Sequence, residues 1–361
     1  MKIFIILGTR PEIIKMSPVI RECIKKKLNF SILHTNQHYS ENLDKVFFKE
    51  LNLPQPKYNL NVGSGTHAEQ TAKILVGVEK ILLKEKADIV LVEGDTNTVL
   101  ASALAAAKLH IRVGHIEAGL RSYYREMPEE INRILTDHCS DLLFAPTKKA
   151  RDILLNEGIS KKNIFVTGNT VVDAVFQNLK LAEKKSKILE KLHLSKRGYF
   201  LMTAHRAENV DNKDRLESIL KGVEMVSKRF SLSVIYPIHP RTRKMLKNFK
   251  LAIPKSINLI EPLGYLDFLK LENNARLILT DSGGMQEESC IMKVPCVTLR
   301  DNTERPESTE VGGNLLSGAN SLKILKCVSK MLNKNRKWKN LFGFGKAAEK
   351  IIKIVQKNEK R

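Results

Sequence analysis

The sequence predicts an α/β protein built from two Rossmann-like domains, each a doubly wound parallel sheet, that face a central cleft. Three observations lead to this prediction. Short apolar runs rich in β-branched residues alternate with helix-length segments along the whole chain, a pattern typical of parallel sheets with covering helices. The series of runs is too long for one sheet. Polar groups recur directly after the runs, where open α/β sheets bind their ligands.

The predicted strands are short apolar runs that follow one another from the N-terminus almost to residue 300. They are 3–7, 30–34, 88–93, 112–116, 142–145, 164–167, 199–203, 233–237, 258–261, 276–280 and 296–299. The segments between them are amphipathic or Ala-rich, as at 99–109 and 215–230, and are expected to be helices.

A break in this alternation marks the expected domain boundary. After the strand at 164–167, the segment 171–197 is polar and helical in pattern and contains no strand. We therefore expect a first domain at residues 1–168 and a second at 169–344. A GFG turn separates the last helix, residues 345–361, which is expected to pack back on the first domain.

Composition and cysteine content exclude several classes of protein. The 361 residues are 42% hydrophobic and 28% charged, which is ordinary for a globular protein. The five cysteines are an odd number without a CxxC pair, so neither a disulfide framework nor a zinc site is expected. No apolar run approaches the roughly 20 residues of a membrane helix, and the first run is interpreted as a strand rather than a signal peptide. A cytoplasmic protein without membrane insertion is expected.

The net charge of +22 raises the question of a nucleic-acid partner. Much of the surplus lies near the C-terminus, where residues 321–361 contain eleven Lys and two Arg against two Glu. Most of these lysines fall on polar faces of predicted helices, which is typical of a solvated basic surface. The pattern therefore predicts no nucleic-acid partner, while the same positive field favours anionic small substrates.

The first strand is followed by GTRPE, which has the form of a strand, a turn and a helix start. Pro11 suits a first helical position. The motif lacks the GxGxxG of dinucleotide folds, so no nicotinamide cofactor is expected. Arg10 and Lys15 are candidates to flank a phosphate, although an arginine in a turn is also often only solvated.

Acidic residues follow two neighbouring predicted strands and begin a helix. Asp95 comes from EGDTNT, Glu117 from HIEAGLRS, and Glu129 and Glu130 from MPEEINR. Carboxylates that converge at one sheet edge raise one another's pKa, which lets a site obtain a base and an acid from one residue type. Structural alternatives are an N-cap role for Asp95, a helix-dipole role for the glutamates, and an i,i+4 pair of Glu129 with Arg133.

The segment DSGGMQEES is the strongest local signal for a ligand. Ser282, Gly283 and Gly284 offer a hydroxyl and backbone amides to a diphosphate at a helix start. Glu287 and Glu288 follow in the first turn of the predicted helix, where a carboxylate suits a ribose hydroxyl. The motif is not a P-loop, because it lacks GK[ST].

The motif TAHRAEN places His205 between a strand and a helix. This histidine could serve a metal, a phosphate or a hydrogen bond in the core. No second histidine stands at helical ligand spacing, so no metal site is expected. A role as a phosphate or proton donor fits the neighbouring motifs better.

Seven motifs occur in the order in which they occur in one known family. They are GTRPEIIKMSPVI, EGDTNTVLASALAA, HIEAGLRS, PEEINR, HRAEN, DSGGMQEE and TERPE. In this set, which spans nearly the whole chain, the sequence resembles the non-hydrolysing UDP-N-acetylglucosamine 2-epimerases. The resemblance implies a glycosyltransferase-B architecture, a second domain that binds UDP, a homodimer and an enzyme without a cofactor.

The resemblance also implies a reaction, the interconversion of UDP-N-acetylglucosamine (UDP-GlcNAc) and UDP-N-acetylmannosamine (UDP-ManNAc). UDP is eliminated across C1–C2 to give 2-acetamidoglucal and is then added back with the proton on the other face. By motif match, Asp95, Glu117 and Glu129 are the acid/base set, His205 lies near the leaving diphosphate, and Glu288 binds the ribose. The implied substrate-binding set is Arg10, Lys15, Arg133, Ser282, Gly283, Gly284 and Glu288.

One segment departs from the family pattern. Bacterial members often carry a QHR-type segment that helps to form a second, activating UDP-GlcNAc site, whereas this chain has NQHYSENLD, without an arginine after the histidine. The candidate residues for such a site are Gln37, His38, Arg206 and His239.

Two related activities share much of this pattern. A hydrolysing 2-epimerase would release UDP and free ManNAc, because water would trap the intermediate. A nucleotide-sugar glycosyltransferase of the same architecture would require an acceptor. The non-hydrolysing reaction would supply ManNAc-type sugars for surface polysaccharide synthesis.

Overall fold

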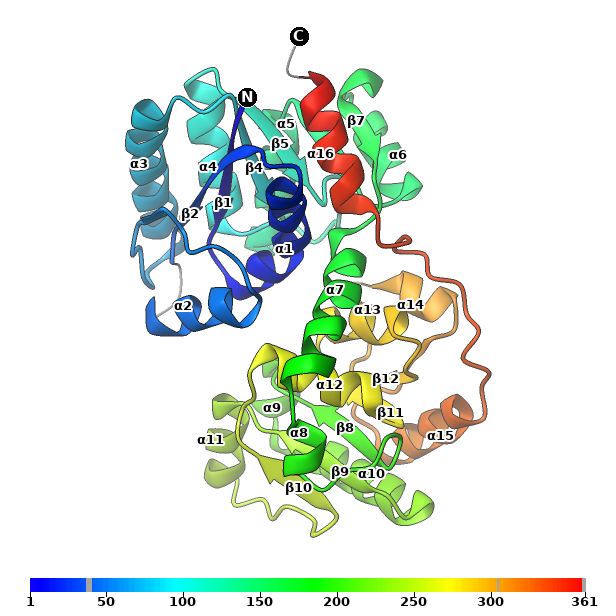
Figure 1. Ribbon diagram of the computed structural model, residues 1–361. Coiled ribbons are helices and arrows are strands. Elements are labelled where there is room, and N and C mark those ends of the chain that lie inside the picture. Colours follow the sequence, from blue (N-terminus) through cyan, green and yellow to red (C-terminus); the bar gives the residue numbers. More distant parts are fainter. Residues whose placement is uncertain (37–40, 304, 359–361) are drawn as a thin grey trace. The chain divides into compact units, whose positions relative to one another are not determined.

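The computed structural model describes residues 1–36, 41–303 and 305–358, with the backbone only for 41–45 (Figure 1). The chain forms two compact units. The first unit comprises Met1–Gln177 and Phe342–Arg361, and the second unit comprises Asn178–Leu341. The division falls within helix α7 (Thr170–Lys185).

The described part of the first unit contains a parallel sheet of seven strands in the order β3-β2-β1-β4-β5-β6-β7. This order reverses direction between β1 and β4, which is the position where doubly wound sheets bind ligands. The strands are β1 (Lys2–Leu7), β2 (Asn29–His34), β3 (Tyr58–Asn59), β4 (Ile89–Glu93), β5 (Arg112–Ile116), β6 (Leu142–Ala145) and β7 (Ile164–Val166).

Helices connect these strands and cover the sheet (Figure 1). They are α1 (Arg10–Lys25), α2 (Glu41–Glu50), α3 (His67–Glu85), α4 (Asn97–Lys108), α5 (Pro128–Cys139), α6 (Lys148–Asn156) and the 3₁₀ helix η1 (Lys161–Asn163). Pro11 and Pro128 lie in the first turns of α1 and α5, where a missing N–H costs nothing. Thr66 and Glu69 form a capping box that starts α3.

The last helix, α16 (Ala347–Lys357), belongs to the first unit and contacts α1. Its apolar residues Ile351, Ile352 and Val355 are buried. The carboxylate of Asp173 accepts hydrogen bonds from the N–H groups of Ala347 and Ala348, both at 3.1 Å. Asp173 therefore accepts hydrogen bonds from two backbone N–H groups that have no partner within the first turn of α16, a helix far away in the sequence.

The described part of the second unit repeats the same topology in a sheet of six parallel strands, β10-β9-β8-β11-β12-β13. Its strands are β8 (Tyr199–Thr203), β9 (Ser233–Pro237), β10 (Ile257–Ile260), β11 (Leu277–Thr280), β12 (Cys296–Thr298) and β13 (Asn314–Leu316). The order reverses between β8 and β11. The expected ligand position is therefore at the carboxyl ends of these two strands.

The helices of the second unit bury an apolar core against this sheet. They are α8 (Ile188–Lys191), α9 (Ala207–Val210), α10 (Lys213–Phe230), α11 (Pro240–Asn248), α12 (Tyr265–Asn274), α13 (Gly283–Ile291), α14 (Pro306–Glu310) and α15 (Ser321–Leu332). Val223 of α10 and Val328 of α15 belong to one buried cluster with Phe200 of β8.

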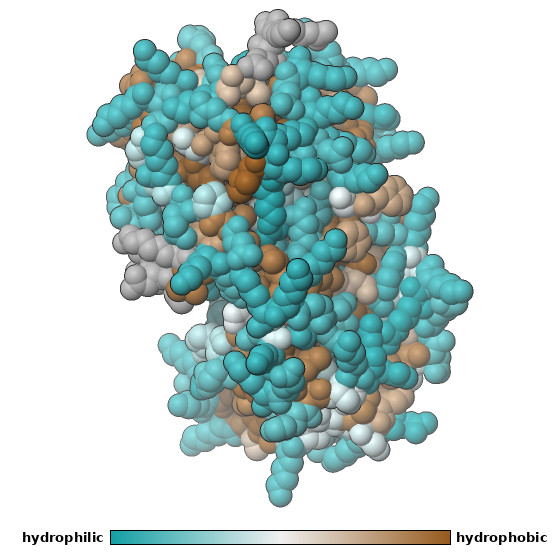
Figure 2. All heavy atoms as spheres, in the orientation of Figure 1, coloured by the Kyte–Doolittle hydropathy of each residue, from teal (hydrophilic) through white to brown (hydrophobic). Residues whose placement is uncertain are grey.

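The predicted fold class, two parallel-sheet α/β units, is confirmed. Strands β3 and β13 were not predicted: β3 has only two residues, and β13 stands between glycines in GGNLLSG, a composition typical of a loop. Among the described helices, none has the length and apolar character needed to cross a bilayer. Hydrophilic side chains are spread over the visible face of both units (Figure 2).

Candidate functional site

The turn after β1 is fixed by a buried glutamate. Glu12 accepts a hydrogen bond from the N–H of Gly8 at 2.7 Å and one from the Thr9 hydroxyl at 2.9 Å. Burial raises the pKa of Glu12 to about 7, even though these donors favour its ionised form. Arg10 is the first residue of α1 and is exposed.

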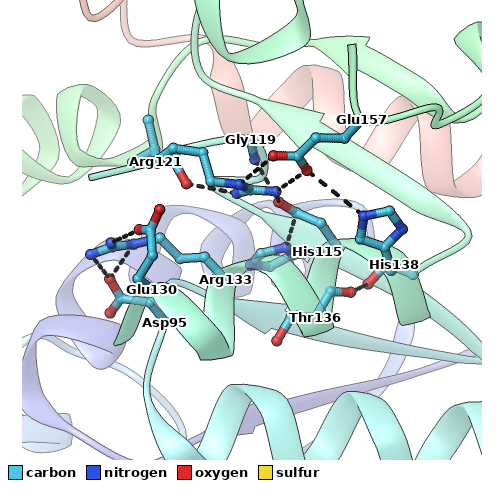
Figure 3. Close-up of polar contacts among 12 residues, drawn as sticks. Asp95, His115, Gly119, Arg121, Glu130, Arg133, Thr136, His138 and Glu157 are labelled. Carbon is cyan, nitrogen blue, oxygen red and sulfur yellow. Dashed lines mark hydrogen bonds and ion pairs between the residues drawn. The ribbon is translucent and has the colours of Figure 1, made fainter. Parts of the chain in front are cut away.

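Asp95 lies two residues after the end of β4, beside the point where the sheet order reverses. The alternative that Asp95 is an N-cap is wrong, because Thr96 is the N-cap of α4 and accepts the N–H of Val99. The carboxylate of Asp95 accepts Nε and Nη2 of Arg133 at 2.9 and 2.7 Å (Figure 3). Its side chain is 34% exposed and so remains accessible to a ligand.

Glu130 is a structural carboxylate that supports this arrangement. It is buried and accepts the N–H groups of Ser122 and Tyr123 at 2.9 Å, and it pairs with Arg133 at 2.7 Å. Burial alone raises the pKa of Glu130, but these donors outweigh burial and hold it below the ordinary value. Glu129, the candidate acid/base residue, is half-buried one position earlier in the first turn of α5.

Glu117 follows β5, the strand next to β4, and has a left-handed backbone conformation with φ of +70°. Its Oε2 lies 2.5 Å from the ammonium nitrogen of Lys15, and the same nitrogen lies 3.0 Å from Oε1 of Glu93. Lys15, a candidate phosphate ligand, is thus placed between two carboxylates at the ends of neighbouring strands.

Glu93 was not predicted as a site residue. Its side chain is only 1% exposed at the end of β4. Burial raises the pKa of Glu93 well above its ordinary value, and nearby Glu117 adds to this effect while Lys15 opposes it. The only sequence signal is an acidic residue at the last position of an otherwise apolar strand, as in IVLVE.

In the second unit, Asp281 orients His205. Asp281 directly follows β11 and is fully buried; its Oδ2 accepts the N–H groups of His205 and Arg206, both at 2.9 Å. Its Oδ1 lies 3.1 Å from Nδ1 of His205, so that Nε2 is the nitrogen left for a ligand. Burial by itself raises the pKa of Asp281. The hydrogen bonds and charge of His205 and the backbone donors lower it by more, so the net shift is downward.

Asp281 was also missed by the sequence analysis. The signal was an aspartate at the first position after a buried strand, next to the residues that were singled out in DSGG.

The loop after β11 leads into α13 with Ser282 as the N-cap. Within the described part of the chain, the Ser282 hydroxyl caps no N–H of this helix. Gly283 is buried, and Gly284 is exposed; apart from its chain neighbours and the adjacent helix backbone, no described atom lies within 4 Å of the position that a Cβ would take. These residues leave the first amides of α13 open to an anion.

The expectation that two glutamates lie in the first turn of α13 is wrong. The helix starts at Gly283, so Glu287 and Glu288 lie one turn later, and the first turn contains no acidic residue. Glu287 pairs with Nε of Arg305 at 3.0 Å, and Tyr265 donates to Oε1 of Glu288 at 3.2 Å. Neither glutamate therefore opposes an anion in the first turn of α13.

The residues considered for a second nucleotide-sugar site are described only in part. Arg206 is exposed, and His239, also exposed, has its ring centroid 5.6 Å from that of His205. Burial and the neighbouring His205 lower the pKa of His239. Gln37 and His38 lie outside the described residues.

Comparison with known proteins gives a consistent result. A family model described as UDP-N-acetylglucosamine 2-epimerase matches residues 21–356. A UDP-N-acetylglucosamine 2-epimerase from Methanocaldococcus jannaschii is 61% identical, over 98% of this chain and 99% of the relative. One from Methanococcus maripaludis is 59% identical, over 98% of each chain. The crystal structure of the Methanocaldococcus jannaschii UDP-GlcNAc 2-epimerase in complex with UDP-GlcNAc and UDP matches with a TM-score of 0.88 and 61% identity, over 99% of this chain and 100% of that one.

Proposed function

The chain belongs to the UDP-N-acetylglucosamine 2-epimerase family, and we propose that it interconverts UDP-GlcNAc and UDP-ManNAc without net hydrolysis. One base removes the proton from C2 of the sugar, and the bond between C1 and the UDP oxygen breaks. The products of this half-reaction are 2-acetamidoglucal and UDP. In the return step, the UDP oxygen bonds to C1 again while an acid delivers a proton to the opposite face of C2.

The observation that carries the proposal is the pair Asp95 and Glu117 at the ends of the adjacent strands β4 and β5. Each carboxylate is held by a different cation, Arg133 for Asp95 and Lys15 for Glu117. A reaction that takes a proton on one face and returns it on the other needs two such groups in different surroundings. Glu129 completes the proposed acid/base set.

In the proposal, the second unit holds the UDP part of the substrate. Ser282, Gly283 and Gly284 offer a hydroxyl and helix-start amides to the diphosphate, and Glu288 binds the ribose. His205, oriented by Asp281 through Nδ1, presents Nε2 to the leaving diphosphate, and as an imidazolium it donates from Nε2 and stabilises the charge that develops there. Arg10 supplies a further positive charge to the phosphates.

Turnover in deuterated water tests the reaction. We expect UDP-GlcNAc to give UDP-ManNAc that carries deuterium at C2, measured by mass spectrometry and NMR. Stoichiometric UDP with free ManNAc would instead identify a hydrolysing epimerase. A product that forms only with an added sugar acceptor, with unlabelled C2, would identify a glycosyltransferase.

Three further features belong to the proposal and rest on the family resemblance. The protein is a homodimer, which sedimentation velocity tests directly. Arg206 and His239 contribute to an activating second UDP-GlcNAc site, so their replacement by alanine lowers substrate activation. The product supplies ManNAc-type sugars for surface polysaccharide synthesis.

A further inference from the structure

His115 is a histidine inside strand β5, and its side chain is 1% exposed. Its Nδ1 lies 2.7 Å from Oδ1 of Asp137 on α5. Its Nε2 lies 2.9 Å from the backbone carbonyl oxygen of Gly94, the residue before Asp95. Both ring nitrogens therefore face acceptors.

This geometry determines the charge of the ring. A neutral imidazole has one N–H donor and one acceptor nitrogen, so it satisfies only one of two acceptors. A carboxylate and a carbonyl are both satisfied only when both nitrogens carry hydrogen. Burial lowers the pKa of His115, but Asp137 and the Gly94 carbonyl outweigh burial, and the net shift is upward.

Asp137 extends the contact to the loop that carries Glu117. Its Oδ2 accepts the N–H of Gly119 at 3.1 Å and lies 2.8 Å from Nη2 of Arg121. The Arg121 guanidinium also binds Glu157 through two hydrogen bonds at 2.8 and 2.6 Å. The charge of the fully buried Asp137 is thus balanced by His115 and Arg121. Its hydrogen bond from the Gly119 N–H links it to the loop two residues after Glu117.

We propose that His115 is a positioning residue, which as an imidazolium ties the loop of Asp95 to the loop of Glu117 through Asp137. The proposal rests on the proposed function, in which both carboxylates act on the sugar. It predicts that alkaline deprotonation of His115 frees the Gly94 carbonyl and lowers kcat.

The groups that face His115 define its titration. On the sheet, its partners are the apolar residues Val92 of β4 and Leu143 of β6. The charged groups are Asp137 on α5, Arg121 behind Asp137, and Glu117 after β5. The two carboxylates favour the imidazolium, and Arg121 opposes it through Asp137.

Two amide substitutions separate the two hydrogen bonds. The amide nitrogen of Asn sits near the Nδ1 position of histidine, and that of Gln sits near the Nε2 position. His115→Asn therefore keeps the bond to Asp137 and loses the bond to Gly94, while His115→Gln does the reverse. We expect His115→Asn to lower kcat by roughly 10- to 100-fold, with a KM within a few-fold of the unchanged protein, because loop displacement misplaces Asp95.

A second variant, His115→Gln, and a control, His138→Asn, test whether a change in kcat comes from the loss of the His115 contacts. His115→Gln keeps the bond to Gly94 but breaks the link through Asp137, so it is also expected to lower kcat and to lose the alkaline decline of kcat. His138→Asn makes the same change at an exposed histidine of the same region, 3.8 Å from Glu157, and is expected to leave kcat unchanged. Equal kcat for the unchanged protein and His115→Asn would overturn the proposal.

Two measurements do not depend on turnover. In protein labelled with ¹⁵N-histidine, both ring nitrogens of His115 should show protonated chemical shifts at pH 7; one unprotonated nitrogen would overturn the inference. Hydrogen exchange at residues 94–96 and 117–121 should be faster in His115→Asn, and unchanged exchange would count against positioning. If the unchanged protein formed no C2-labelled UDP-ManNAc, the proposed function would fail, while these two results would still decide the role of His115.

Discussion

The ammonium nitrogen of Lys15 lies 2.5 Å from Oε2 of Glu117, although 102 positions separate the two residues in the sequence. The contact joins α1 to the end of β5, and the same ammonium reaches Glu93 at the end of β4. One cation thus stabilises two carboxylates in a part of the protein that water barely reaches.

Replacing the acid/base carboxylates is expected to separate catalysis from binding. Asp95→Asn and Glu117→Gln should each lower kcat by roughly 10²- to 10⁴-fold, because proton transfer by a positioned side chain contributes on this scale. The Kd for UDP, measured by calorimetry, should change only a few-fold. Asp152→Asn alters an exposed aspartate on α6 and serves as the control. Lost UDP binding with normal turnover would contradict the assignment.

Lys15→Met is expected to destabilise the protein by about 2–4 kcal/mol at pH 8, because it leaves two buried carboxyl groups without their cation. The folded pKa of Glu93 lies above its unfolded value, so its contribution to stability is present below about pH 4.5 and is lost as the pH rises through the folded pKa. The loss in Lys15→Met should therefore be smaller at pH 5 than at pH 8 in urea unfolding.

Lys25→Met on the same helix provides the matched control. The Lys25 side chain is 72% exposed and pairs with Glu22, and such surface pairs contribute little. If Lys25→Met destabilised the protein as much as Lys15→Met, burial of the Lys15 ion pairs would not explain the loss of stability in Lys15→Met.

Glu12 should make stability fall between pH 4.5 and pH 7. Burial raises its folded pKa to about 7, so folding favours the protonated form. The stabilising contribution is complete below pH 4.5 and disappears as the pH rises through 7, a change on the order of 3 kcal/mol. In Glu12→Gln this component should be missing from the pH dependence of the free energy of unfolding. Parallel curves for the two proteins would contradict the prediction.

Gly119→Ala should destabilise the protein more than Gly94→Ala. Both glycines have positive φ, +81° and +89°, so both substitutions carry a conformational cost of about 1 kcal/mol. A Cβ at Gly119 would also lie 2.4 Å from the carbonyl oxygen of Ala150, whereas one at Gly94 would meet no atom within 4 Å. We expect an additional loss of about 1–3 kcal/mol for Gly119→Ala in thermal or urea unfolding.

Gly284→Ala should weaken UDP binding without loss of stability. The position has space for a Cβ, and alanine favours a helix over glycine by up to about 1 kcal/mol. The new methyl group would stand where the proposal puts the diphosphate, so we expect the Kd for UDP to rise about tenfold or more. If calorimetry showed unchanged UDP binding, the diphosphate would not bind at the start of α13.

The fold could be predicted well from the sequence, because buried parallel strands are apolar on both faces and stand out as runs such as IFIIL and IVLVE. Residues just beyond these runs, such as Asp95 and Ser282, are predicted to belong to the site for the same topological reason. Strand β3 has too few residues to show a pattern, and the glycines on either side of β13 make it look like a loop.

The pairings within the candidate site could not be predicted, because they depend on side-chain contacts between distant segments. Sequence alone did not show that Lys15 binds Glu117 and Glu93, or that Thr96 rather than Asp95 caps α4. The contact of Asp281 with His205 crosses from one strand end to the next. Each of these contacts requires the sheet order before it can be inferred.

Because Asp173 accepts hydrogen bonds from the first N–H groups of α16, the first unit is assembled from two segments that lie on either side of the second unit in the sequence. During synthesis, the ribosome releases the second unit before it releases the helix that completes the first. We therefore expect a nascent chain stalled before residue 347 to expose the apolar face of α1 that α16 normally covers, so that the N-terminal portion, although made first, matures last.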